Sequence, residues 1–314
     1  MKKKFMTFLN LLVNAFYGRN IKITTSSGVY QLRTTFGHPL KRYLTNFEKY
    51  DRFLPFLSKV TSKSVIDIGS NIGDTLVLIK SISNTEVICV EPDKNFIRYL
   101  HQNIEQNNFK SIKLYPYPIS AEKKIVAIEK NALKSTSNTN DATNGDSKSA
   151  MSTKTFRDLL TDLSLDISTI GIIKSDTDGF DWDCLNSIAD YFDFESNEID
   201  YPEFIFYEHQ TYLNNIGLKD PHSKDREKWY ENSLKRLGRH GYTEFYIFDN
   251  FGTLLHQTKD INELLNLTSG LIKSRRLRNK FPEYFLDVLI TQPAMSHIVE
   301  KAFKLQRLEK IIVN

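Results

Sequence analysis

Acidic residues and glycines lie together where two apolar stretches of the sequence end. One stretch contains Asp67 and is followed by Gly69 and Gly73, and the next stretch is followed by Glu91. Glycine adopts positive φ easily and lets the backbone approach a ligand closely. A carboxylate offers paired acceptors, so Glu91 could bind both hydroxyls of a ribose. An acid about twenty residues after a glycine turn is typical of nucleoside-binding sites.

The glycine pattern argues against two common phosphate-binding motifs. Asn71 stands where a dinucleotide fingerprint has its second glycine, and no G-x-x-x-x-G-K-[ST] motif occurs. Asp74, at the start of the expected helix, would repel a pyrophosphate. A ligand with a ribose, an adenine and a cationic sulfonium suits these acids better, which predicts S-adenosylmethionine. In this interpretation Asp67 lies at the lip of the cleft and helps to hold the charged end of the cofactor. The alternative is that Asp67 caps a turn that the glycines form.

A second group of polar residues follows two later apolar stretches. Lys174, Asp176 and Asp178 end one stretch, and Glu208 and His209 end the next. Neighbouring parallel strands end at one edge of a sheet, so we expect these side chains to converge on the cofactor face. His209 or Asp176 could accept the proton of a substrate hydroxyl. Asp176, Asp178 and Glu208 could instead hold a divalent cation such as Mg²⁺.

The same residues also have structural interpretations. Asp178 and Asp181 could cap the helix that starts near Phe180, and His209 could be a polar strand end. For Asp181 and Asp183 we favour the structural interpretation. For Asp176 and His209 we favour a function, because functional residues gather at this edge of an α/β sheet. The candidate catalytic residues are Lys174, Asp176 and His209.

Apolar runs alternate with helical patterns from Ser64 onward. This alternation predicts an α/β three-layer sandwich, in which helices cover both faces of a seven-stranded, mainly parallel sheet. Asp93 is expected to cap one of the helices. The expected strands are Val65–Ile68, Val87–Val90, Ile112–Tyr115, Ile170–Ile173, Phe204–Tyr207, Phe245–Phe248 and Phe285–Ile290.

Two regions depart from this alternation. Residues 1–60 are expected to form a small cap of a hairpin at 20–34 and helices, ahead of a main domain at 61–314. Residues 1–17 carry three lysines and a one-sided apolar pattern, which predicts an amphipathic helix on its own domain, with a membrane-surface anchor or a signal sequence as alternatives. Residues 131–153 are rich in Ser, Thr and Asn, which predicts a mobile loop, either a surface excursion or a lid.

Composition and charge limit the classes of protein to which this chain can belong. Of the 314 residues, 40% are hydrophobic and 25% are charged, as in an ordinary globular protein. The net charge of +4 does not demand a nucleic-acid or membrane partner. The two cysteines, Cys89 and Cys184, lie in apolar contexts. We therefore expect a reduced, cytoplasmic setting.

Four segments resemble, in order and spacing, the FkbM family of S-adenosylmethionine-dependent methyltransferases. They are "VIDIGSNIGDTL", "VICVEPDKNFIRYLHQNIEQNN", "IIKSDTDGFDWDCL" and "FIFYEH", within residues 64–212. The family typically has Ile-Lys-Ile-Asp-Val-Glu-Gly in the third segment. Here Ser175, Thr177 and Asp178 replace its second Ile, its Val and its Glu, and Asp178 has a shorter reach than glutamate.

The resemblance implies a seven-stranded methyltransferase fold whose last strand, "EYFLDVLIT", is reversed. It also implies O-methylation, often of sugar hydroxyls in glycolipids, capsules or natural products, and it places Ile119 and Ser120 beside the adenine. The candidate cofactor-binding residues are Asp67, Gly69, Asn71, Gly73, Glu91, Pro92 and Ser120.

Two other functions stay open. A nucleic-acid methyltransferase would share the cofactor half, but the sequence has no Asn/Asp-Pro-Pro-aromatic motif. Neither cysteine is expected at the carboxyl end of a strand, where cytosine C5 chemistry would need one. The dense basic cluster "KSRRLRNK" at 273–280 is the main nucleic-acid signal, but we favour its interpretation as a solvated helix or loop. The other possibility is a non-catalytic S-adenosylmethionine-binding protein or a membrane-associated scaffold.

Overall fold

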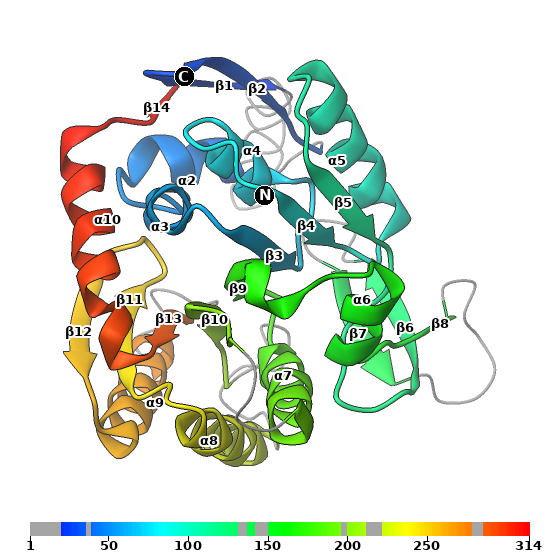
Figure 1. Ribbon diagram of the computed structural model, residues 1–314, viewed down its shortest axis with the longest axis vertical. Helices are drawn as coiled ribbons and strands as arrows, with labels where there is room; N and C mark the ends of the chain where they lie inside the picture. Colours follow the sequence, from blue (N-terminus) through cyan, green and yellow to red (C-terminus); the bar gives the residue numbers. More distant parts are fainter. Residues whose placement is uncertain are drawn as a thin grey trace, which may run out of the picture.

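An eight-stranded sheet forms the centre of the computed structural model of this chain (Figure 1). The structure describes residues 20–35, 39–130, 137–141, 150–195, 200–211, 222–277 and 285–314. In spatial order the strands are β12 (Leu254–Thr258), β11 (Glu244–Asp249), β13 (Leu286–Thr291), β10 (Phe204–His209), β9 (Ile170–Ser175), β3 (Ser64–Ile68), β4 (Val87–Val90) and β5 (Ile112–Tyr115).

The five strands from β10 to β5 are parallel, and β13 runs antiparallel to both of its neighbours, β10 and β11. This confirms the α/β class, the seven predicted strands and the reversed last strand. The additional strand is β12, which pairs with β11 at the edge of the sheet. Its residues Leu254 and Leu255 are both exposed, so the alternating pattern of a half-buried strand is missing from its sequence.

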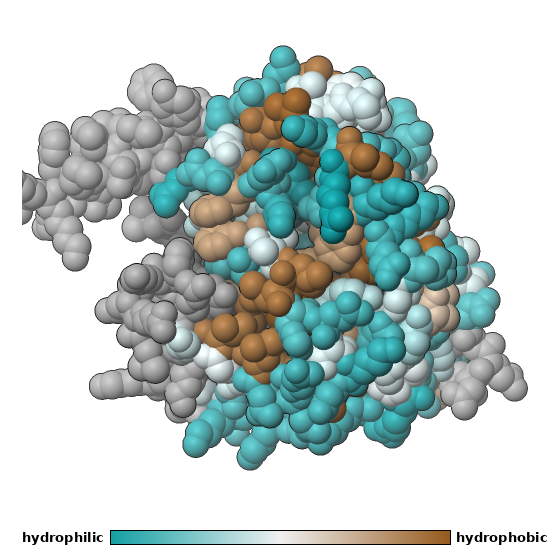
Figure 2. Space-filling model, turned by 90° about the vertical axis from the view of Figure 1, so that its left-hand side faces the viewer, coloured by the Kyte–Doolittle hydropathy of each residue, from teal (hydrophilic) through white to brown (hydrophobic). Residues whose placement is uncertain are grey.

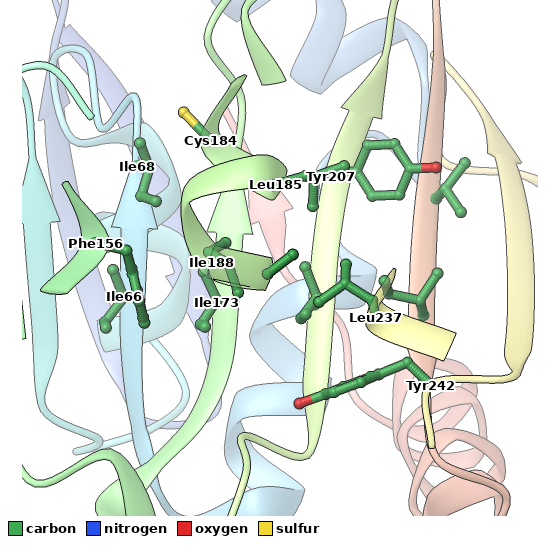
Figure 3. Packing of buried hydrophobic residues seen from close by; sticks show 14 of the residues in the cluster. Ile66, Ile68, Phe156, Ile173, Cys184, Leu185, Ile188, Tyr207, Leu237 and Tyr242 are labelled. Carbon is green, nitrogen blue, oxygen red and sulfur yellow. The ribbon is translucent and has the colours of Figure 1, made fainter. Parts of the chain in front are cut away.

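Helices cover both faces of the sheet, as the alternation predicts (Figure 1). Two hydrophobic clusters, one for each face, hold the helices to the strands. Figure 3 shows part of one cluster, in which Phe156 and Ile188 lie beside Ile66 and Ile173 of the sheet. The helices of this face are α6 (Phe156–Asp162), α7 (Asp181–Glu195), α8 (Ser223–Arg239) and α9 (Ile261–Leu277). The helices of the other face are α2 (Leu40–Asn46), α3 (Phe53–Thr61), α4 (Asp74–Lys80), α5 (Lys94–Gln106) and α10 (Ser296–Leu308).

The N-terminal segment joins this second face. The predicted hairpin is present as β1 (Asn20–Thr25) and β2 (Gly28–Arg33), and β1 also pairs with β14 (Ile312–Val313). The buried side chains of the hairpin belong to the same hydrophobic cluster as α4 and α5. A boundary at residue 60 stays a prediction, and the predicted helix at residues 1–17 lies outside the described residues.

The segment 131–153 contains regular structure that the sequence analysis did not expect. Its described parts form β7 (Ser137–Asp141) and β8 (Ala150–Ser152), and both pair antiparallel with β6 (Ile125–Lys130). Backbone hydrogen bonds form such a ladder whatever the side chains are. A polar sequence such as "SNTND" therefore does not by itself predict a strand.

The face seen from the left of Figure 1 carries bands of hydrophobic atoms between hydrophilic ones (Figure 2). The elements at this side of the molecule include α10 and β12 (Figure 1). None of the described helices combines the length and the apolar character that a bilayer crossing requires.

Candidate active site

A glycine turn joins β3 to α4 at the carboxyl edge of the sheet. Gly69 and Gly73 both have φ of +85°, and Asn71 between them has φ of +48°. A Cβ on Gly69 would lie 1.8 Å from the carbonyl oxygen of Asp176, at the end of the neighbouring strand β9. The glycine therefore permits two strand ends to approach each other, in addition to any approach by a ligand.

We expect Gly69→Ala to lower the free energy of unfolding by more than about 2 kcal/mol, because both the positive φ and the clash with a backbone oxygen oppose a side chain. Urea denaturation would measure the change. Gly270→Ala is the matched control: apart from its chain neighbours and the backbone of its own helix, no atom lies within 4 Å of the position that its Cβ would take. It lies in α9, where alanine stabilises by up to about 1 kcal/mol. Equal stability of the two variants would contradict the expected clash.

Glu91 follows β4 and is fixed by backbone donors on both carboxylate oxygens. Its Oε2 accepts from the N–H of Asn71 at 2.8 Å, and its Oε1 accepts from the N–H of Asp93 at 2.8 Å. Each oxygen keeps a further lone pair for a ligand hydroxyl. Burial raises the pKa of Glu91 to about 8, and the two N–H donors partly oppose this shift.

A cleft of about 600 Å³, counting the part open to solvent, lies above these strand ends. Of the predicted site residues, Gly69, Asn71, Glu91, Pro92, Asp176 and Asp178 line it. Apolar side chains complete the walls and suit the flat, apolar faces of an adenine. They are Ile68, Val90, Phe96, Pro118, Ile119 and Phe180. The sequence analysis missed Phe96 and Phe180 as site residues; Phe180 follows a glycine directly after the acidic strand end, and this position was the available signal.

Asp67 lies beneath the cleft, so the prediction that it lies at the lip is wrong. The residue is fully buried, and its Oδ1 accepts from Nζ of Lys174 at 3.0 Å. The two residues are register partners on β3 and β9, so their side chains lie on one face of the sheet. Lys174 also pairs with Asp176 at 3.2 Å. Burial alone would lower the pKa of Lys174, but the surrounding carboxylates raise it well above its usual value, so the ammonium is charged.

Gly73 and Ser120 do not line the cleft either. A Cβ on Gly73 would lie 2.4 Å from Leu100, so this glycine serves the packing of α4 against α5. The hydroxyl of Ser120 donates to Asp183 at 2.8 Å. Asp181 similarly accepts from the Ser175 hydroxyl at 2.6 Å. Asp181 and Asp183 thus have structural roles, but Asp181 is the first residue of α7 and bonds back to β9 instead of capping the helix.

The second group of predicted polar residues does not stay together: some of its members line the cleft and others are buried in the core. The side chain of Asp176 is half exposed, at 51% accessible, and the residue lines the cleft. His209 is buried, its ring stacks on Tyr230 at 4.3 Å, and burial lowers the pKa of its imidazole to about 3. Glu208 is also buried, and burial followed by the charges of nearby carboxylates raises its pKa well above the usual value. The described residues hold no group of three potential ligands arranged for a metal ion, so Asp176, Asp178 and Glu208 do not form the expected Mg²⁺ site.

A parallel sheet with a reversed strand, a glycine turn after its first parallel strand and an acid after the second define a class I, S-adenosylmethionine-dependent methyltransferase. The sequence model described as "Methyltransferase FkbM domain" matches residues 67–243, which is more than half of the chain. The chain belongs to this family of methyltransferases.

Solved structures of other methyltransferases match at low sequence identity. An O-methyltransferase from Bacillus cereus in complex with SAH is 11% identical with a TM-score of 0.40, over 77% of this chain and 80% of that one. A putative caffeoyl-CoA O-methyltransferase from Staphylococcus aureus is 13% identical with a TM-score of 0.39, over 77% of this chain and 82% of that one. No protein of curated function matches the sequence.

Proposed function

We propose that the protein methylates a hydroxyl oxygen of a sugar, a glycan or a natural-product precursor. The observation that carries this proposal is the position of Asp176. Asp176 is half exposed and lines the same cleft as Glu91, and its carboxylate pairs with Lys174. A carboxylate at this place can accept the proton of a hydroxyl group, whereas His209 is turned into the core.

The cofactor fits the groups that the cleft offers. Glu91 would bind the two ribose hydroxyls, the backbone of the turn at Gly69 and Asn71 would border the methionine portion, and Phe96, Ile119 and Phe180 would enclose the adenine. The bound cofactor supplies an electrophilic methyl group on a sulfonium.

The residues of the chain then position the acceptor and take up its proton. The cofactor would give its methyl group to the acceptor oxygen and leave as a neutral thioether, while the residues of the chain would hold the acceptor in line with that methyl group. Asp176 receives the hydroxyl proton and passes it to solvent. Correct in-line positioning supplies much of the rate enhancement in such a reaction, and proton transfer adds about 10²–10⁴-fold. The methyl transfer and the proton transfer described here need no metal ion.

Calorimetric titration with S-adenosylmethionine, followed by transfer of a radiolabelled methyl group to a panel of nucleotide sugars and glycans, tests the proposal. We expect Asp176→Asn to bind the cofactor within about threefold of the wild-type affinity and to lose at least about 100-fold in turnover. Asp200→Asn, at an exposed position, should change neither quantity. Transfer to nitrogen of an RNA substrate, or full turnover by Asp176→Asn, would contradict the proposal.

The two cysteines, Cys89 and Cys184, are buried and free. Unpaired thiols are the usual state in a reducing compartment. They support the further proposal that the protein acts in the cytoplasm.

A further inference from the structure

A groove of about 1540 Å³, counting the part open to solvent, lies between α10, β12 and the segments around α2 and α3. The C-terminal strand β14 completes its wall. α3 packs against α10 and α2 packs against β14, and Figure 1 shows these elements together at one side of the molecule. No described residue lines both this groove and the cofactor cleft, so the two are separate sites.

Apolar side chains cover much of the groove, and part of their surface is open to solvent. Leu254 of β12 is 37% exposed and Ile312 of β14 is 50% exposed. Figure 2 shows hydrophobic atoms between hydrophilic ones on this side of the molecule. The other apolar side chains of the groove are Leu44, Phe56, Phe303, Ile311 and Val313. An aliphatic chain laid along them would remove apolar surface from water on both partners, which favours binding.

A buried cation without a counter-ion lies in the wall of this groove. Arg52, directly before α3, is 8% exposed, and its terminal nitrogens donate to the carbonyl oxygens of Leu44 and Ile311, which both line the groove. Among the described residues no carboxylate pairs with this guanidinium, and neither its Nε nor the buried Nε2 of Gln306 has a hydrogen-bond partner. A buried charge is costly unless it is paired, so the site favours an anionic ligand.

The other charged side chains of the groove also leave an excess of positive charge. Three exposed cations line it: Lys49, Arg307 and Lys310. In the ranges that the structure describes, none of the three pairs with a carboxylate. Of the two carboxylates in the lining, Glu309 already pairs with Lys59 at 2.7 Å, and Glu48 is exposed. Burial lowers the pKa of Arg52, and Glu48 and Asp51 only partly oppose this effect. The guanidinium stays charged at neutral pH.

We propose that this groove binds a single-chain amphiphile with an anionic head group, a carboxylate or a phosphate. The head group pairs with Arg52, because a guanidinium presents donors that match both kinds of anion. The apolar chain lies along Leu254, Phe303 and Ile312. The ligand is a free molecule and not a bilayer, because a flat lipid surface cannot reach a guanidinium that is buried in a concave wall. This inference goes beyond the proposed function and does not depend on it.

Calorimetric titration of the full chain, at ligand concentrations below micelle formation, tests the assignment. The probes are octyl phosphate, 1-octanol, which lacks the anion, and inorganic phosphate, which lacks the chain. Arg52→Gln removes the buried cation. The double variant Lys49→Gln with Lys310→Gln removes two exposed cations of the groove and decides the test if Arg52→Gln does not fold. Lys304→Gln is the matched control, because Lys304 is exposed on α10 and does not line the groove.

We expect the wild type to bind octyl phosphate at least about tenfold more tightly than either octanol or inorganic phosphate. Arg52→Gln should lose at least about tenfold in affinity for octyl phosphate, and the double variant about threefold. Neither should change the affinity for octanol by more than about twofold, and Lys304→Gln should behave as the wild type does. Circular dichroism checks that each variant is folded.

Several results would overturn the assignment. Equal affinities for octyl phosphate and inorganic phosphate would make the groove a general anion site, and equal affinities for octyl phosphate and octanol would remove the role of the head group. Unchanged binding of octyl phosphate by the folded charge variants would exclude Arg52 and its neighbours. Binding only after deletion of residues 1–17 would assign the groove to that segment, since the strand that follows it, β1, pairs with β14.

Discussion

Glu91→Gln is expected to weaken binding of S-adenosylhomocysteine by about 10–100-fold. The glutamine keeps one oxygen but presents an N–H group to a position where the N–H of Asn71 or Asp93 already donates. It also removes one acceptor for the ribose hydroxyls. Each lost hydrogen bond to a charged group costs about 1.5–3 kcal/mol, which gives this range of affinity. Calorimetric titration measures it directly.

The same variant should remove a pH dependence of cofactor binding. Burial raises the pKa of Glu91 to about 8. Ribose hydroxyls donate to the carboxylate and so favour its ionised form, which means that binding near neutral pH releases a proton. We therefore expect the affinity to rise between about pH 6.5 and 8.5 and then to level off. Titration in two buffers of different ionisation enthalpy would count the proton released.

The raised pKa of Glu91 has the opposite effect on protein stability: cofactor affinity rises with pH, whereas stability falls. Between the ordinary pKa of 4.5 and the folded value of about 8, the cofactor-free native state holds a proton that the unfolded chain has lost. The contribution of Glu91 to stability therefore falls as pH rises through this window. Glu105→Gln, at an exposed position of α5, is the control and should change neither property. A pH-independent affinity in the wild type would contradict the argument.

Lys174→Met is expected to lower the free energy of unfolding by about 3–5 kcal/mol. The substitution leaves the carboxylate of Asp67 fully buried without its cation, and removing one partner of a buried ion pair costs this much. Methionine has a similar volume, so the loss would reflect the unpaired charge and not a cavity. Urea denaturation at pH 7 measures the change.

The double variant Lys174→Met with Asp67→Asn tests the cause. Removing both charges should restore most of the lost stability, and a double-mutant cycle should give a coupling of about 2–3 kcal/mol. Lys59→Met is the control, because Lys59 pairs with Glu309 at a position where both side chains are partly exposed. Purely additive effects of the Lys174 and Asp67 substitutions would contradict the expected coupling.

The central fold could be predicted from the sequence because its strands are short, apolar and separated by helical patterns. All seven predicted strands are present, and Asp93 caps α5 by accepting from the N–H of Asn95. The edge strand β12, the two-residue strand β14 and the three strands β6, β7 and β8 of the small sheet were missed. Each is held mainly by backbone hydrogen bonds to a distant or neighbouring strand, and a side-chain pattern does not record those partners.

The sequence predicted which segments contribute residues to the site, but it predicted less well which of those side chains reach the cleft. Glu91 and Asp176 lie in the cleft as expected. Asp67 and His209 also come at strand ends, but one residue of offset along a strand turns a side chain to the other face. Asp67 consequently meets Lys174, and His209 meets Tyr230. The approach of Asp51 to Lys174 and Asp287 could not be foreseen, because Asp51 belongs to a segment without a motif and reaches this edge of the sheet only through tertiary packing.

The position of β13 between β10 and β11 has a consequence for synthesis of the protein. β10 ends at His209 and β11 ends at Asp249, but the strand that joins them is complete only at Thr291. A chain emerging from the ribosome therefore carries two separate pieces of sheet with open facing edges until that residue has been made. Open edges invite pairing with other chains. The nascent protein is thus most prone to aggregation after Asp249 and before Thr291 has been made. Slow translation of this segment would prolong its dependence on chaperones.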